Sequence, residues 1–384
     1  MMSDALGDGI FTADGAKWKF QRQLAVSIFS VKAFREFTGN IFVLEGKKVI
    51  DILGKVADDG TVIDIQDLLL QYTLDVFGTV SFGKSFGCLN GIDQVAPFAE
   101  AIDDLLEISA RRINDPIWKI RERFNGTTEK IASDKKMIHD YAQNIIDKRR
   151  REGYHAEKKD LLQMFMSGKD DLGESLSDNL IIDNIVTFTA GGRDSTAHAL
   201  TWMFYLLLRD GTDADIMENL VREADDVLEG QDPTYDTYKK QKYTEACFNE
   251  ALRIYPVAPR NLRHCEVDDI LPDGTKVYAG EWVAWSSYVM GRSELVWGAD
   301  AKEYKPSRWM NTEKPPASKF NSFLLGPRVC IGQQFATIEA LTIIGMILQK
   351  FNLELEDPSR VPTYRPSMAF PMAGGLNIRV SWRT

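Results

Sequence analysis

At residues 323–332 the chain reads FLLGPRVCIG, and this stretch decides how the rest of the sequence is interpreted. One cysteine, Cys330, follows a loop that contains Gly326 and Pro327 and stands directly before the apolar segment 333–350. Backbone N–H groups of such a loop, and of a helix that begins after it, stabilise a negatively charged sulfur. An isolated cysteine is more often a buried structural residue, so the loop alone leaves both roles open.

The same stretch resembles a known motif at more positions than the cysteine. Phe323, Gly326, Arg328, Cys330 and Gly332 match the pattern Phe-x-x-Gly-x-Arg-x-Cys-x-Gly, the cysteine loop of the cytochrome P450 haem-thiolate family. The resemblance implies that Cys330 is the axial iron ligand of a haem b and that the other four residues surround this haem. A thiolate ligand of this kind donates electron density that favours O–O cleavage.

Two further segments resemble the family in its order along the chain. Glu250 and Arg253 lie three residues apart, so both side chains project from one face of a helix. Such a pair alone is common on protein surfaces and is worth ~0–1 kcal/mol. The segment YKPSRW at 304–309 resembles the family's Pro-x-Arg-aromatic element, whose arginine, here Arg308, joins the pair in a buried network beneath the cysteine loop. The resemblance therefore implies structural roles for Glu250, Arg253 and Arg308 in retaining the haem.

Four residues are candidates for holding the haem propionates. Trp18 and Arg22 are spaced i, i+4, so both side chains can reach one anion. This spacing resembles the family's Trp-x-x-x-Arg element, although an ordinary amphipathic helix shows it as often. Arg263 and Arg328 match further propionate contacts in relatives, and the fixed donor fork of arginine suits a carboxylate.

Residues 191–196, GGRDST, interrupt an otherwise apolar segment. Ser177 is predicted to cap this segment, which continues as one helix to Leu208. Two adjacent glycines and an acid beside hydroxyl groups are unfavourable inside a buried helix. A local conflict of this kind indicates a functional position.

This interruption resembles the family's oxygen-activation motif, Ala/Gly-Gly-x-Asp/Glu-Thr. The resemblance implies that Gly191 and Gly192 open the helix beside the haem. It also implies that Asp194 and Ser195 are the catalytic residues that supply protons. Ser195 stands where threonine is usual, so its hydroxyl lacks the methyl group that fixes the rotamer. Thr196 points about 100° away around the helix and is a poorer candidate.

The apolar pattern of the 384-residue chain predicts a mainly α fold with small β-sheets. We expect one haem-binding domain over residues 1–384, helix-rich in 1–255 and mixed α/β with the cysteine loop in 256–384. The resemblance implies a cytochrome P450 fold that lacks its N-terminal anchor, its first helices and part of its first sheet. Helices are predicted over 18–30, 31–53, 65–82, 96–108, 130–151, 213–228 and 333–350, and strands over 277–288, 353–356 and 376–382.

Composition excludes several other classes of protein. The 46 basic and 56 acidic residues leave a net charge of −10, which argues against a protein that coats nucleic acid. The four cysteines lack CxxC spacing, so neither a disulfide framework nor a cysteine zinc site is indicated. His198 and His264 have no partner at metal-ligand spacing. No uninterrupted apolar run approaches the ~18 residues of a spanning helix, so no membrane anchor is expected within this chain.

The resemblance implies a monooxygenase that inserts one oxygen atom from O2 into a C–H bond of a lipophilic substrate. Residues 6–11 and 279–297 look most like the branch that hydroxylates long-chain fatty acids, often at the ω-carbon. Electrons would come from NADPH through a separate NADPH-cytochrome P450 reductase, because no flavin or nicotinamide domain lies in this chain. Full-length relatives act at the cytosolic face of the endoplasmic reticulum membrane. Two alternatives stay open, a haem-thiolate isomerase or dehydratase acting on a hydroperoxide, and a non-catalytic haem-binding fragment.

Overall fold

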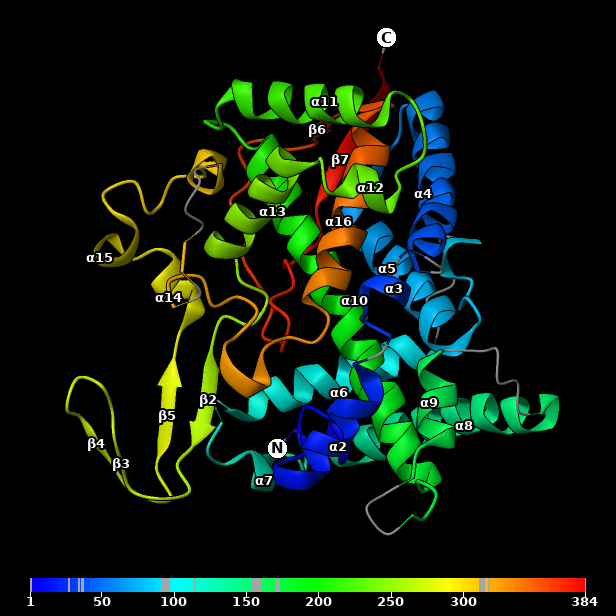
Figure 1. Ribbon diagram of the computed structural model, residues 1–384, viewed down its shortest axis with the longest axis vertical. Coiled ribbons are helices and arrows are strands. Elements are labelled where there is room, and N and C mark those ends of the chain that lie inside the picture. Colours follow the sequence, from blue (N-terminus) through cyan, green and yellow to red (C-terminus); the bar gives the residue numbers. More distant parts are fainter. Residues whose placement is uncertain are drawn as a thin grey trace.

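The structure is a computed structural model, and it confirms a mainly helical fold with small antiparallel sheets (Figure 1). The residues that it describes are 2–26, 28–33, 35, 38–90, 97–113, 115–153, 160–169, 173–310, 315–316 and 318–383. Its α-helices are α1 (Ser3–Leu6), α2 (Gly15–Ala25), α3 (Val31–Ala33), α4 (Gly39–Asp59), α5 (Ile65–Phe82), α6 (Pro97–Ile113), α7 (Trp118–Arg121), α8 (Thr127–Glu152), α9 (Leu161–Ser167), α10 (Asp178–Leu208), α11 (Ala214–Leu228), α12 (Tyr235–Tyr238), α13 (Lys242–Ile254), α14 (Ser287–Gly291), α15 (Glu294–Trp297) and α16 (Gln333–Leu348).

The strands form three small antiparallel sheets. The largest has the order β1-β7-β6, while β2 pairs with β5 and β3 pairs with β4. In β6, residues 351, 353 and 355 are buried and alternate with exposed ones, as in a sheet with one face on the core. The β3–β4 hairpin projects at the lower left of Figure 1. The strands are β1 (Val62–Asp64), β2 (Asn261–His264), β3 (Asp269–Ile270), β4 (Lys276–Val277), β5 (Trp282–Trp285), β6 (Phe351–Leu355) and β7 (Asn377–Trp382).

The long central helix α10 confirms the prediction made from its apolar pattern. Its 31 residues span about 45 Å, and the Ser177 hydroxyl caps it by accepting a hydrogen bond from the Leu180 N–H at 3.3 Å. α5, α13 and α16 pack against α10. Because neighbours surround this helix, nearly all of its middle turns are buried, and a polar residue there must find a partner inside the protein.

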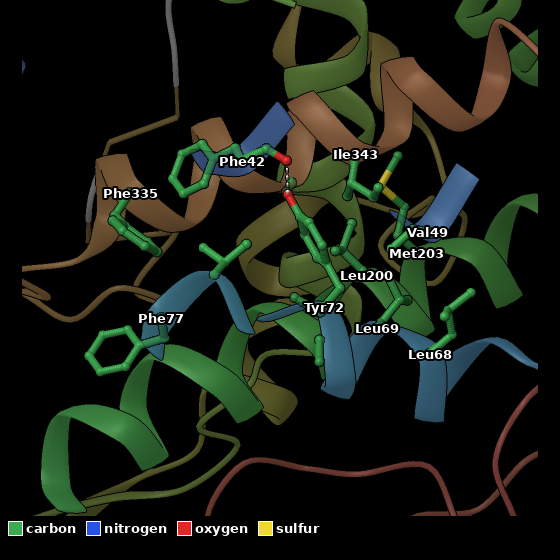
Figure 2. Packing of buried hydrophobic residues seen from close by; sticks show 14 of the residues in the cluster. Phe42, Val49, Leu68, Leu69, Tyr72, Phe77, Leu200, Met203, Phe335 and Ile343 are labelled. Atoms are coloured by element: carbon green, nitrogen blue, oxygen red, sulfur yellow. Dashed lines mark hydrogen bonds between the residues drawn. The ribbon is translucent and has the colours of Figure 1, made fainter. Parts of the chain in front are cut away.

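The core lies between α4, α5, α10 and α16. Tyr72 of α5 has no exposed surface, and its hydroxyl donates to the Phe42 carbonyl of α4 at 3.3 Å. Figure 2 shows this hydrogen bond among side chains of all four helices, which include Val49, Leu68, Leu69, Leu200, Met203 and Ile343.

Two predicted elements differ from the structure. The helix predicted over 31–53 is two helices, α3 and α4, and α4 continues to Asp59 because Gly60 ends it in the left-handed conformation (φ 63°). The strand predicted over 277–288 is divided, since Gly280 turns the chain at φ 92° between β4 and β5. Its last residues belong to α14, which the Ser286 hydroxyl caps.

Other helices match their predicted positions within a few residues. The helices predicted over 65–82, 130–151, 213–228 and 333–350 correspond to α5, α8, α11 and α16. The one predicted over 18–30 is α2, which ends at Ala25. The one predicted over 96–108 is α6; residue 96 lies outside the described residues, and the helix continues to Ile113.

One segment is long and apolar enough to cross a membrane by composition. It covers Gly326–Leu348, and 72% of the 18 residues that form its most apolar stretch are buried inside the protein. Helix α16 forms most of it and packs against α4, α10 and α13, as a core helix does.

Glu250 and Arg253 of α13 form the fully buried pair implied by the sequence. Both side chains have no exposed surface, and the guanidinium donates to both carboxylate oxygens at 2.8 Å. Arg308 donates to Glu250 at 3.2 Å, and the Trp309 indole and the Lys305 backbone N–H donate at 2.9 Å each. The carboxylate thus receives hydrogen bonds from two separate parts of the chain.

The remaining donors of Arg253 bind the backbone of the loops between residues 291 and 303. They reach the carbonyls of Gly291, Ala301 and Glu303, the last at 2.8 Å. Gly291 must be glycine, because an added Cβ would lie 1.9 Å from the Arg253 carbonyl oxygen. The Ser322 hydroxyl then donates to the Leu252 carbonyl at 2.9 Å and fixes the start of the cysteine loop on the same helix.

We predict that Glu250→Ala lowers the free energy of unfolding by ~3–5 kcal/mol, because it strands the Arg253 charge without its partner. Thermal or denaturant unfolding measures this loss. Glu245→Ala, in the first turn of the same helix and paired with Lys242 near the surface, is the matched control and should cost less than ~1 kcal/mol. Equal stabilities of the two variants would show that the buried network contributes nothing.

Candidate functional site

The Cys330 sulfur lies beside the backbone N–H groups of Gly332 and Gln333, where α16 begins. Both N–H groups favour its ionised form. The Cys330 N–H itself donates to the Phe323 carbonyl at 2.8 Å and closes the loop. Gly326 allows this closure at φ 70°, in the left-handed region. The loop therefore presents one sulfur in a fixed direction at a helix N-terminus.

The sulfur is crowded by protein on several sides, yet Cys330 is exposed to solvent on another. Crowding raises the pKa of the Cys330 thiol above its usual value, while the two N–H groups and the charge of Arg22 act in the opposite direction. The thiol is therefore protonated at neutral pH when it is alone. A bound metal cation deprotonates a coordinating thiol outright, so the loop is suited to a metal that brings its own charge.

Three arginines and a tryptophan gather beside this loop. The guanidinium carbon of Arg328 lies 4.3 Å from the centre of the Trp18 ring, and that of Arg22 lies 5.8 Å from it. Arg328 donates to the Ala13 carbonyl and to the exposed carboxylate of Asp14. Partial burial lowers the pKa of Arg328, and the positive charges of Arg263 and Arg22 lower it further. The structure thus brings together all four residues expected to hold propionates.

The protein neutralises this positive cluster only in part, because Arg328 alone pairs with a carboxylate, that of Asp14, among the described residues. Within the part of the chain that the structure describes, Arg22 and Arg263 have no carboxylate partner, and Arg263 instead lies over the Trp285 ring at 5.4 Å. At Gly332 an added Cβ would lie 4.0 Å from the sulfur, so glycine keeps that side open. An exposed sulfur beside excess guanidinium groups fits haem b, whose iron needs an axial ligand and whose two propionates need cations.

The glycines of the 191–196 segment allow close packing. An added Cβ at Gly192 would lie 2.2 Å from the Phe77 ring of α5, and one at Gly191 would lie 3.0 Å from the Phe11 ring. The local opening of the helix that the resemblance implied is absent from this segment, because α10 runs through it without a break. The Ser195 hydroxyl donates to the Gly191 carbonyl at 2.6 Å, one turn earlier.

Asp194 is buried beside a positive charge. The Arg193 guanidinium donates to its carboxylate at 3.0 Å, and it also binds both oxygens of Asp103 on α6. Burial raises the pKa of Asp194 to about 7, against the attraction of Arg193 and with a further contribution from Asp103. A carboxyl group with a pKa near the working pH both accepts and releases protons readily.

The sulfur loop and the acid–hydroxyl turn meet through aromatic rings. Phe77, which lies under Gly192, packs against Phe335 of α16 with ring centres 6.5 Å apart. Phe29 contacts Phe335 at 5.9 Å and Phe188 of α10 at 6.3 Å. Residues from four separate segments therefore place α10 and the start of α16 in one region.

Sequence reasoning missed three charged residues in this region. Arg193 occupies the variable position of its motif, and Asp103 lies 90 residues earlier with no spacing that links them. Glu339 was visible as the one charged residue in the apolar segment 333–348. It has no exposed surface, and burial raises its pKa well above the usual value. The nearby Thr196 hydroxyl opposes this rise, but its geometry falls short of a full hydrogen bond.

The two histidines considered as metal ligands, His198 and His264, have different surroundings. Burial lowers the pKa of His198 to about 3, so it is neutral, while His264 is exposed and packs edge-on against Trp282. Among the described residues, no three His, Cys, Asp or Glu side chains are grouped as metal ligands.

Comparison with known proteins agrees with this geometry. The sequence model of the family described as Cytochrome P450 matches residues 2–375. Cytochrome P450 monooxygenase cyp1 of Mycosarcoma maydis is 34% identical over all of this chain, which spans 64% of that relative, just under two thirds of its length. Cytochrome P450 94B3 of Arabidopsis thaliana is 35% identical, and Cytochrome P450 94A1 of Vicia sativa is 31% identical. All of this chain aligns with each plant protein and spans 77% and 76% of their lengths. The chain therefore belongs to the cytochrome P450 family, whose cofactor is haem b.

Proposed function

We propose that this chain is the catalytic part of a monooxygenase that inserts one oxygen atom from O2 into a C–H bond of a lipophilic substrate. The observation that carries the proposal is the placement of an exposed cysteine at the start of α16 and an acid–hydroxyl turn of α10 in one region. Haem bound there supplies the oxygen activation and the oxidising power. The protein's own residues hold the cofactor and deliver protons.

Each group has a task that follows from its position. Cys330 would provide the sulfur that holds the haem iron, and Arg22, Arg263 and Arg328 would provide cations for its propionates. The carboxyl group of Asp194 holds a proton near neutral pH because of its burial. The Ser195 hydroxyl, which donates to the Gly191 carbonyl at rest, belongs to the next residue of α10 and would relay that proton.

We further propose a long-chain fatty acid as the substrate. Residues 6–11 and 279–297 resemble the fatty-acid hydroxylase branch, and the first of these segments lies directly on α10. The Thr187 hydroxyl donates to the Leu6 carbonyl at 3.3 Å, and the half-exposed Phe11 ring faces Gly191. The Phe11 ring therefore lies beside α10 about one turn before Asp194 and Ser195, where an apolar side chain can contact the alkyl chain of a fatty acid.

The proposal includes the partners implied by the resemblance. Electrons come from NADPH through a separate NADPH-cytochrome P450 reductase, and the full-length protein acts at the cytosolic face of the endoplasmic reticulum membrane. A haem-thiolate isomerase or dehydratase is the second candidate, since it uses the same sulfur ligand. The acid–hydroxyl pair favours the oxygenase, because an isomerase needs no delivered protons.

We predict that Cys330→Ser abolishes the red-shifted Soret band that carbon monoxide gives with a reduced thiolate-ligated haem. The iron loses its only sulfur ligand, whereas Cys265→Ser, the matched control at the other accessible cysteine, keeps the band. The optical spectrum of the reduced, haem-loaded chain measures this difference. An unchanged band in the Cys330 variant would end the haem-thiolate proposal.

We predict that Ser195→Ala lowers the ratio of oxygenated fatty acid to NADPH by about tenfold or more and diverts electrons to peroxide or water, since a positioned proton donor contributes about 10²–10⁴-fold. Ser195→Thr should equal or improve the ratio, because the added methyl group restricts χ1. Reductase-supported turnover, with NADPH, product and peroxide measured together, makes the test. The same ratio in the alanine variant would remove Ser195 from the mechanism, and no oxygenated product from the unsubstituted chain would refute the substrate.

A further inference from the structure

Arg193 links the acid of the α10 motif to a second helix. Its side chain is 7% exposed, and its two terminal nitrogens donate to both carboxylate oxygens of Asp103 on α6, the Nη2–Oδ2 distance being 3.0 Å. The Nη1 atom that binds Asp103 also donates to Asp194 at 3.0 Å. One buried cation therefore serves two carboxylates that belong to different helices.

The two carboxylates are not equivalent. The Asp103 side chain is 46% exposed and holds the guanidinium with both oxygens, whereas the Asp194 side chain is 6% exposed and holds it with one. Water can solvate the charge of Asp103 but not that of Asp194. Asp194 receives one hydrogen bond from Nη1 and not the paired, two-bond contact that best stabilises a carboxylate, since both terminal nitrogens bind Asp103 and the Arg193 Nε–H has no partner among the described residues.

Other ionisable groups around Arg193 do not replace Asp103. On α5, burial raises the pKa of Asp67, and Arg193 opposes this rise. On α10, His198 is neutral, and Arg193 and Arg365 both disfavour its charge. Burial disfavours the charge of Arg193 itself, but Asp194 and Asp103 outweigh it, and the Cys88 thiol adds a smaller contribution in the same direction.

We propose that Asp103 is a positioning residue that keeps Asp194 in its proton-carrying form, because it occupies the guanidinium of Arg193 and adds a negative charge nearby. This inference deepens the proposed function, because it assigns to α6 the control of the proton that α10 delivers. If the ion pair of Asp103 and Arg193 only held α6 to α10, its loss would lower the stability of the protein. It would not change the pH at which Asp194 releases its proton.

The direction of the effect follows from the charges. Replacing Asp103 by asparagine removes a neighbouring negative charge and frees the guanidinium for a paired contact with Asp194. Both changes favour the ionised form and lower the pKa of Asp194 from its raised value. Asp103 is half exposed, so the variant should fold.

The test is the infrared C=O band of protonated Asp194, followed against pH in the full, haem-loaded chain. Subtracting the spectrum of Asp194→Asn isolates this band, because the buried carboxyls of Glu45 and Glu339 contribute equally to both spectra. In the unsubstituted chain we expect half of the band to be lost near pH 7. For Asp103→Asn, the spectrum to subtract is that of the double variant Asp103→Asn, Asp194→Asn. The pH at which half of the Asp194 band is lost should then be lower by about one pH unit or more.

Asp104→Asn is the matched control. It removes the same charge from the next position of α6, but Asp104 pairs with Lys130 and not with Arg193. Its midpoint should equal that of the unsubstituted chain. Equal midpoints in Asp103→Asn and the unsubstituted chain would overturn the proposal, as would the absence of any band that Asp194→Asn removes.

Failure of the proposed function has a separate signature. If Asp194→Asn leaves the ratio of product to NADPH unchanged, Asp194 is not the proton donor and the role in catalysis is refuted. If that ratio falls in Asp194→Asn while the Asp103→Asn midpoint does not move, the proton donor is supported and the control by α6 is refuted.

Discussion

The buried carboxylate of Glu250 is the constraint on which the cofactor side of this structure depends. An unpaired carboxylate with no exposed surface would be prohibitively unfavourable, so Arg253, Arg308, the Trp309 indole and a backbone N–H close around it. This closure fixes the loops from 291 to 309 on α13. The Ser322 hydroxyl then ties the beginning of the cysteine loop to the end of the same helix. The position of the sulfur is therefore set by a charge that never contacts it.

The region around the sulfur shows the opposite electrostatics, because only one of its three arginines, Arg328, pairs with a carboxylate among the described residues. Arg22 and Arg263 have no carboxylate among the described residues, and the Cys330 thiol is driven towards its neutral form by crowding. Unpaired guanidinium charges and a sulfur that can lose its proton to a metal both suit a group that combines a cation with two carboxylates. Haem b is such a group, so its binding would give partners to the free guanidinium groups and would stabilise the folded chain.

Sequence patterns predicted the elements whose signals are local. The Ser177 cap and the length of α10, the pair at 250 and 253, and the helix after Cys330 all depend on neighbours within one or two turns. The strand predicted over 277–288 was wrong because Gly280 adopts a positive φ that β-branched neighbours do not reveal. The contact of Phe77 with Gly192 and the bridge from Arg193 to Asp103 join segments about 90 residues or more apart. Only the tertiary structure brings such residues together, so spacing in the sequence carried no sign of them.

X-ray absorption at the iron edge of the haem-loaded chain identifies the atoms bound to the iron. If the fold presents one sulfur, from Cys330, to a haem iron whose propionates lie on the arginine cluster, we expect four nitrogen atoms and one sulfur atom in the first shell of the iron. A shell of nitrogen and oxygen alone, in a chain with full haem occupancy, would contradict ligation by Cys330.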